Sequence, residues 1–122
     1  MVEVRFLVEG DTEETFVNRV LRSHFFPLGI NPHPQKLVKP GHYSGIVEYP
    51  RARSEILTTL RQGMVSFCTT MFDHYAMPTS WPARETAAAK PEVIEEAILA
   101  DISTKMGEGF NRARFIPYVQ MH

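Results

Sequence analysis

"VEVRFLVEGDTEETF", residues 2–16, joins a strand-like run to the start of a helix through a single glycine. Alternate residues of its first half are apolar, and this period of two predicts a β-strand over residues 2–8 with one well-buried face. Apolar residues then recur at helical spacing from Phe16 onward. We therefore expect a strand, a tight turn and a helix, with Asp11 or Thr12 as the helix cap.

The rest of the chain alternates helical and strand-like patterns. A helical pattern over residues 51–62 precedes an apolar run over 64–72, and a helix that begins at a proline, 91–102, precedes a last strand over 114–122. Such alternation predicts an α/β fold with a mostly parallel sheet of about four strands flanked by helices. Neither a repeat nor a linker interrupts it, so we expect a single domain over residues 1–122.

Two proline-containing segments are harder to interpret. Residues 31–50 hold four prolines, so we expect mostly loop there, with only residues 35–38 suited to a short strand. Pro117 pushes the last strand toward a sheet edge or an irregular start, because proline lacks the N–H that a central strand donates.

Composition narrows the class of protein. With 43% apolar and 22% charged residues, the chain is typical of a globular protein. It has no run of about 20 apolar residues to cross a membrane and no signal-peptide pattern at its start. Cys68 is the only cysteine, which fits a buried position in a cytoplasmic protein. The net charge of -1 provides no general attraction for nucleic acid, so any such contact would come from a local patch.

Two of the predicted strands end in acidic residues. Glu9 follows the first strand and Asp73 follows the apolar run. Ligands of open α/β sheets gather at the carboxyl ends of strands, so these carboxylates would converge if the two strands are neighbours. Hard oxygen ligands suit Mg2+ or Mn2+, which could stabilise charge on a phosphoryl group or activate a water.

Each acid also has a structural interpretation. Glu13 and Glu14 fall in the first helical turn, where carboxylates favour the helix dipole, and Asp11 is better placed as a cap than as a ligand. Asp73 is either a site residue or the start of a turn. Glu9 precedes the glycine and lies too early to cap the helix, so both a functional and a structural role remain open for it.

Three motifs resemble one bacterial family. "VEGDTEETFVNRVL" (residues 8–21), "TTMFDHYAMPTSWP" (69–82) and "RFIPYVQMH" (114–122) look like the domain-of-unknown-function 4276 family, and they occur in the expected order. That family is similar to Toprim domains, the metal-dependent fold of primases, topoisomerases and OLD-type nucleases. The resemblance implies a Toprim/Rossmann-like sheet.

The resemblance also implies roles for individual residues. Glu9 resembles the Toprim glutamate that acts as general acid or base, and Asp73 resembles the first acid of the metal-holding motif. We expect Mg2+ or Mn2+ to bind Glu9, Asp73 and Glu13, beside the backbone of Gly10, Asp11 and Thr12.

The sequence departs from the family pattern at two places. His74 and Tyr75 follow Asp73 where a second aspartate, two residues on, is expected. Relatives usually continue past the last strand, whereas this chain ends at His122, so we expect it to lack their C-terminal segment. An exposed sheet edge would then favour a homodimer, and an inactive fragment is an alternative.

Three functions remain open. The first is a Mg2+-dependent nuclease or phosphoryl-transfer domain, which by family analogy would work beside an ATPase in anti-phage defence. The second is a non-catalytic interaction module that keeps the fold without the metal set. The third is a phosphate or nucleotide binder at Gly10, which we rank last because the surrounding acids repel a bare phosphate.

Overall fold

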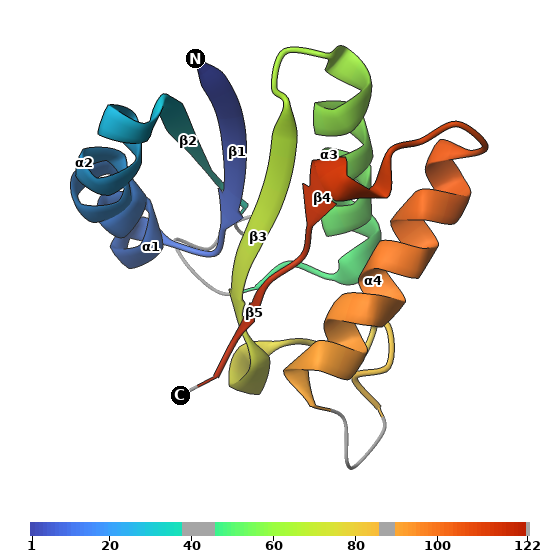
Figure 1. The fold of residues 1–122 in the computed structure, drawn as a ribbon. Coiled ribbons are helices and arrows are strands. Elements are labelled where there is room, and N and C mark those ends of the chain that lie inside the picture. Colours follow the sequence, from blue (N-terminus) through green and yellow to red (C-terminus); the bar gives the residue numbers. More distant parts are fainter. Residues whose placement is uncertain (38–45, 86–89, 122) are drawn as a thin grey trace.

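A parallel sheet lies between two groups of helices in the computed structural model, which describes residues 1–37, 46–85 and 90–121 (Figure 1). All strand pairs are parallel, and the order is β2-β1-β3-β4, with β5 continuing beside β3. The strands are β1 (Val2–Val8), β2 (Ile30–Lys36), β3 (Phe67–Asp73), β4 (Phe115–Ile116) and β5 (Val119–Gln120). The predicted α/β architecture, with its mostly parallel sheet, is confirmed.

The helices follow the predicted order. They are α1 (Asp11–Phe16), α2 (Arg22–Phe25), α3 (Tyr49–Gln62) and α4 (Pro91–Met106). A π-helical stretch, Val17–Leu21, joins α1 to α2, and short 3-10 turns occupy Phe26–Leu28, His74–Ala76 and Arg112–Arg114. Glycines with positive φ end two of the segments, Gly29 after the α2 region and Gly63 after α3, because only glycine adopts that conformation without strain.

Strand β2 is longer than the sequence predicts, since residues 30–36 pair with the whole of β1. The N–H of Leu37 donates to the carbonyl of Val8 at 2.9 Å, so alternate residues before it also direct their N–H groups toward β1. Pro32 and Pro34 have the opposite parity, so their missing N–H groups would have pointed away from β1, toward the outer edge of the sheet. The expectation of a loop was therefore wrong here, because proline is tolerated on an edge strand.

The outer edge of β2 is blocked near its middle. Its prolines have no N–H to offer, and Arg22 of α2 donates to the carbonyl of Pro32 at 2.8 Å and to the side chain of Asn31 at 2.9 Å. Edge strands that lack free donors and acceptors resist sheet extension. Association through this edge is therefore disfavoured.

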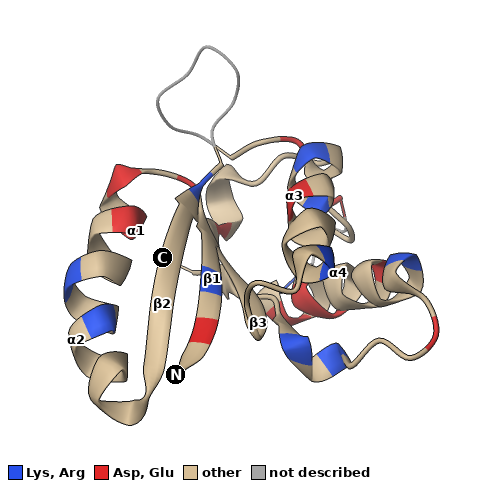
Figure 2. Cartoon of the chain, turned by 90° about the horizontal axis from the view of Figure 1, so that it is seen from above, with Lys and Arg blue, Asp and Glu red and all other residues tan. Residues whose placement is uncertain are grey.

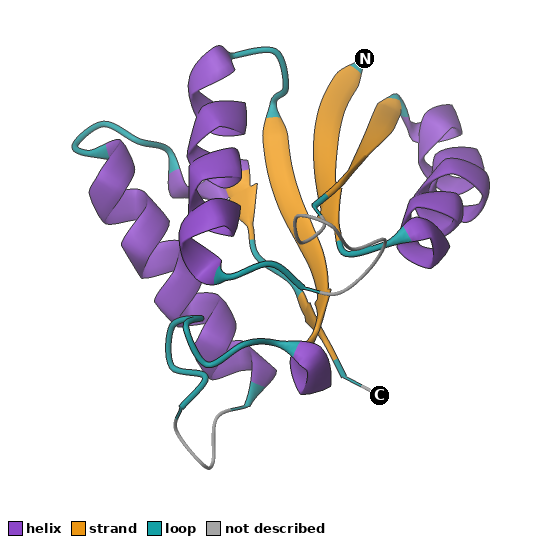
Figure 3. Cartoon of the chain, turned by 180° about the vertical axis from the view of Figure 1, so that it is seen from behind, coloured by secondary structure: helices purple, strands orange, loops and turns teal. Residues whose placement is uncertain are grey.

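The two faces of the sheet are covered unequally. We call the face that carries Leu7 and Phe72 the back face, and the opposite one, which carries Val4 and Phe67, the front face. Helices α3 and α4 pack on the back face and complete the main core with it (Figure 3). The front face is bordered by α1 and α2 on the β2 side only (Figure 1).

This unequal cover corrects the expected burial of β1. The alternation predicted that Val2, Val4, Phe6 and Val8 form the buried face. Of these, Val8 is fully buried, but Val2 is 37% exposed, whereas Leu7 on the other face is completely buried. The sequence pattern shows which residues share a face, but the helices decide which face is covered.

The predicted last strand is divided at Pro117 into β4 and β5, whereas the sequence suggested a single strand at a sheet edge or with an irregular start. Thr70 of β3 bridges the interruption: its hydroxyl oxygen accepts the N–H of Tyr118 at 2.8 Å, and the hydroxyl donates to the Tyr118 carbonyl at 2.9 Å. The neighbouring Thr69 hydroxyl donates to the carbonyl of Ile116. Side-chain hydroxyls thus replace the ladder bonds that proline removes.

Glu95 of α4 gives a prediction for pH dependence. Its carboxylate accepts the N–H of Val119 at 2.8 Å, and burial raises its pKa above 4.5, with the hydrogen bond opposing and Glu92 adding to the shift. The folded protein therefore binds this proton more tightly than the unfolded chain does. The protonated group stabilises the fold at low pH, and this stabilisation is lost as the pH rises through the folded pKa. Glu95→Gln keeps the hydrogen bond without the charge, and we expect it to raise the free energy of unfolding at pH 7 by less than about 1 kcal/mol.

Urea unfolding of Glu95→Gln and of the unsubstituted protein at pH 7 and near pH 4.5 measures the effect. The gain from Glu95→Gln should shrink as the pH falls. Glu96→Gln, at an exposed position on the same helix, is the matched control and should show little change at either pH. A gain that grows toward low pH would contradict the prediction.

Cys68 behaves as expected from the sequence, and Trp81 fixes a neighbouring segment. Cys68 is fully buried, and its burial raises the pKa of its thiol to about 12, which makes it a small apolar residue rather than a nucleophile. Trp81 anchors the segment after β3: it is 1% exposed and its indole N–H donates to the carbonyl of Val47 at 2.9 Å. Within the described ranges, no helix has the length and apolar character to cross a membrane.

Candidate functional site at the carboxyl ends of β1 and β3

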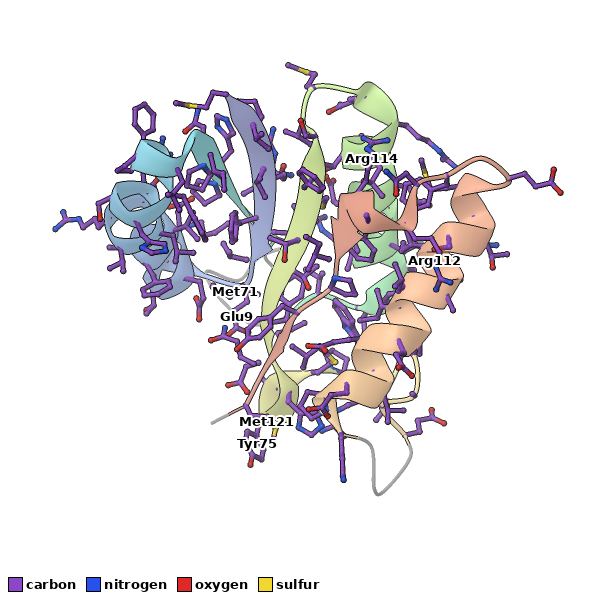
Figure 4. All side chains as sticks on the ribbon, in the orientation of Figure 1. Glu9, Met71, Tyr75, Arg112, Arg114 and Met121 are labelled. Carbon is purple, nitrogen blue, oxygen red and sulfur yellow. The ribbon has the colours of Figure 1, made fainter. Side chains whose placement is uncertain are left out.

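Glu9 and Asp73 lie at the same edge of the sheet. Strands β1 and β3 are direct neighbours in parallel register, with Val8 opposite Met71 as their last pair. Glu9 is the next residue after Val8, and Asp73 is the last residue of β3. Figure 4 labels Glu9 and Met71 at these adjoining strand ends. The condition on which the site hypothesis depended, that the two strands are neighbours, is met.

Asp73 also has a structural role. Its Oδ1 accepts the backbone N–H of Tyr75 at 3.0 Å and so caps the short 3-10 turn that follows β3. This hydrogen bond holds the carboxylate in one orientation at the strand end. Each carboxylate oxygen has two acceptor lone pairs, so the cap is compatible with a metal ligand at the same group.

The start of α1 differs from the prediction. Gly10, in an extended conformation, is the N-cap residue, and within the described part of the chain no side chain caps this helix, so the assignment of Asp11 or Thr12 as the cap was wrong. The helix begins one residue earlier than a capping Asp11 would require. The carboxylate of Asp11 instead forms an ion pair with Lys36 Nζ at 2.5 Å. That hydrogen bond raises the pKa of Lys36 and ties α1 to the end of β2.

Acidic residues are concentrated where α1 begins (Figure 2). Asp11, Glu13 and Glu14 all lie in its first turn, as expected for Glu13 and Glu14. Lys36, the last residue of β2, is a nearby cation, and its charge is engaged by Asp11. This edge of the sheet is thus negative and favours a cation over a bare anion.

A cleft of about 250 Å³ lies beside the two strand-end acids. It is lined by Thr12, Glu13, Phe16, Met71 and Gln120. Met71 precedes Asp73 by two residues on the same face of β3, and Gln120 is the register partner of Asp73. The cleft therefore adjoins the strand end that carries Asp73, although neither Glu9 nor Asp73 is one of its lining residues.

Sequence reasoning missed most of the cleft. Phe16 was assigned to the buried stripe of the helix, but it is 42% exposed and forms a wall of the cleft. Met71 was seen only as part of an apolar strand. Gln120 carried no signal, because its role depends on the pairing of β5 with β3.

The described side chains at this edge could give a divalent cation two carboxylate ligands, but not three. Across residues 1–37, 46–85 and 90–121, no three Asp, Glu, His or Cys side chains are gathered closely enough to hold a metal ion. Glu13 therefore does not complete a preformed group of three with Glu9 and Asp73. Mg2+ keeps several of its waters and commonly takes one or two carboxylates together with substrate phosphates, so a two-carboxylate site suits it.

A second hollow occupies the open part of the front face. It has a volume of about 400 Å³ and is lined by apolar side chains and one threonine. They are Val2, Val4, Phe6, Phe25, Ile30, Phe67, Thr69 and Ile116. This hollow is separate from the acidic cleft, since the two share no lining residue.

The chain belongs to the family described as "Domain of unknown function (DUF4276)", whose model matches residues 8–122. The match begins at the last residue of β1 and includes both strand-end acids and the whole cleft. No curated protein and no solved structure matches the chain.

Proposed function

We propose that this member of the DUF4276 family is a Mg2+-dependent phosphoryl-transfer domain that cleaves nucleic acid. The observation that supports the proposal most strongly is the placement of Glu9 and Asp73 at the carboxyl ends of two adjacent parallel strands, beside a cleft. Ligands of open α/β sheets bind in this position. The resemblance of these two residues to the Toprim acids supports the same assignment.

The two carboxylates have different roles in this proposal. Asp73, oriented by the N–H of Tyr75, holds the cation through a carboxylate oxygen. When bound, Mg2+ neutralises charge on the phosphoryl oxygens and lowers the pKa of a coordinated water. Glu9 accepts a proton from the attacking water and returns one to the leaving oxygen, the general acid–base role that a carboxylate at this position can perform.

The wider context is part of the proposal. By analogy with Toprim-containing nucleases, the domain would work with an ATPase in defence against phage, and a homodimer would bring two sites together. The blocked middle of the β2 edge and the apolar hollow together make the front face the better candidate for self-association.

A cleavage assay with two isosteric variants tests the site. Plasmid DNA, single-stranded DNA and RNA are incubated with Mg2+ or Mn2+ and, separately, with EDTA. We expect metal-dependent cleavage that falls by about 100-fold or more in Glu9→Gln and Asp73→Asn, the usual size of a lost acid–base or metal-binding group. The amide oxygen that Asp73→Asn introduces can still accept the Tyr75 N–H, so the turn is preserved.

Glu108→Gln is the control for a lost carboxylate, because Glu108 is exposed in the turn after α4. It should cleave at the unsubstituted rate. Circular dichroism of each variant shows whether the fold is kept. Metal-dependent cleavage that survives both Glu9→Gln and Asp73→Asn would disprove the site assignment.

A non-catalytic interaction module is the second candidate. The open apolar hollow on the front face favours it, because monomeric proteins rarely expose a large contiguous apolar surface without using it. Absence of cleavage, together with no calorimetric Mg2+ binding at millimolar concentration, would support this alternative over the enzyme.

A further inference from the structure

We propose that the cleft lined by Phe16 and Met71 receives one unpaired nucleobase, so that the substrate of the site is single-stranded nucleic acid. The inference rests on the proposed function, because it assigns the phosphate of the same nucleotide to the strand-end carboxylates. It adds a substrate class and a residue, Phe16, that determines it.

The walls of the cleft suit a flat aromatic ring. Phe16 presents a phenyl ring that is 42% exposed, and Met71 contributes a polarisable thioether from the sheet. Aromatic side chains bind successive bases through stacking, which every base supports. Thioethers also make favourable contacts with aromatic rings.

Three polar side chains, of Thr12, Glu13 and Gln120, line the same cleft. Gln120 brings an amide that can both donate and accept hydrogen bonds, and Thr12 brings a hydroxyl. The edges of nucleobases carry donors and acceptors together, so these groups can satisfy them without selecting one base. A ligand with only aliphatic character would leave them unsatisfied.

The position of the cleft relative to the acids matches a nucleotide. Gln120 is paired with Asp73 in register, and Thr12 follows Glu9 by three residues. A base held in the cleft therefore has its phosphate directed toward the carboxylates, where a cation joins the two negative groups. The negative edge of the sheet excludes a phosphate that arrives without that cation.

The size of the cleft argues for an unpaired base. A volume of about 250 Å³ accepts one base and part of its sugar, but not a stacked base pair. A base in a duplex would have to be unstacked and flipped before it entered, at a cost of a few kcal/mol. Tyr75 lies at the same edge of the sheet and could contact a single strand of nucleic acid there. Its side chain is 62% exposed, and its backbone N–H donates to Asp73.

Fluorescence anisotropy tests the inference without requiring catalysis. A short labelled oligothymidylate, an abasic oligonucleotide of equal length and the matching duplex are titrated with the full chain, with Ca2+ in place of Mg2+ to prevent cleavage. We expect the oligothymidylate to bind about tenfold more tightly than the abasic strand, the size of one base–aromatic stack. The duplex should bind no better than the abasic strand.

The ratio of the affinity for oligothymidylate to the affinity for the abasic strand should fall to near one in Phe16→Ala and should be kept in Phe16→Tyr. Phe26→Ala is the matched control, because Phe26 is 50% exposed and lies at the opposite end of the α1–α2 segment. It should leave the ratio unchanged. Equal affinity for the two strands, an unchanged ratio in Phe16→Ala, or no binding of oligothymidylate overturns the inference.

The two proposals fail in distinguishable ways. Base-dependent binding that Phe16→Ala removes, without any cleavage in Mg2+, supports the cleft and contradicts the nuclease. Metal-dependent cleavage that is equal on single strands and duplex, with a binding ratio of one, supports the nuclease and contradicts the cleft.

Discussion

Trp81→Ala is expected to lower the free energy of unfolding by about 3–5 kcal/mol, the usual cost of truncating a large buried aromatic residue. Trp81 is 1% exposed and packs against Tyr49 and Phe72, with ring centroids 5.2 and 5.1 Å away. Its indole N–H is also the partner of the buried Val47 carbonyl. Because domains are stable by only about 5–15 kcal/mol, this single change approaches the whole margin.

Trp81→Phe separates packing from hydrogen bonding. It keeps an aromatic ring but removes the donor to Val47, so we expect a smaller loss of about 1–3 kcal/mol. Urea unfolding followed by circular dichroism measures both variants, since the protein has no other tryptophan to report by fluorescence. A loss below about 1 kcal/mol for Trp81→Ala would show that the segment after β3 does not depend on this anchor.

Ile98→Ala and Ile116→Ala together test the unequal cover of the sheet. Ile98 of α4 is completely buried in the core behind the sheet, whereas Ile116 of β4 is 53% exposed on the open front face. We expect Ile98→Ala to lower the free energy of unfolding by about 2–5 kcal/mol and Ile116→Ala by less than about 1 kcal/mol. The two changes remove the same side-chain atoms, so the difference reports mainly burial, together with the opposite preferences of helix and strand for alanine.

Urea unfolding at two protein concentrations measures this pair. A large, concentration-dependent loss for Ile116→Ala would mean that another chain covers the front face. A small loss for Ile98→Ala would contradict the position of the core behind the sheet.

Local patterns predicted the regular elements well. Strand β1 occupies residues 2–8 as expected, because alternation of apolar residues and a following glycine mark both ends. Helix α3 ends directly before Gly63, a residue type that marks helix ends. The predicted apolar stripe of α4 holds its buried residues Ile94, Ile98 and Ile102, but Val93 of the same stripe is 45% exposed. Strand β2 was largely missed, because Pro32 and Pro34 weaken a strand pattern unless one knows that their missing N–H groups point away from the neighbouring strand.

The candidate site was predicted in outline only. Glu9 and Asp73 could be singled out because each follows a strand-like run, and the parallel order of the sheet places both at one edge. Asp11 was misassigned as a cap, because its partner Lys36 is 25 residues away and becomes a neighbour only through the pairing of β1 with β2. The cleft depended in the same way on β5, which brings Gln120 beside Asp73.

The sequence by itself determined the order of strands and helices, the residues that share a face and the acids that end the strands. These features depend on periodicity and on neighbours along the chain, which local sterics and hydrogen bonding control. Only the tertiary structure decided which face is buried, which strands adjoin and which side chains line the cleft. Those outcomes depend on residues far apart in the chain coming together, such as Leu7 with the helices behind it, and Phe16 and Met71 as walls of one cleft.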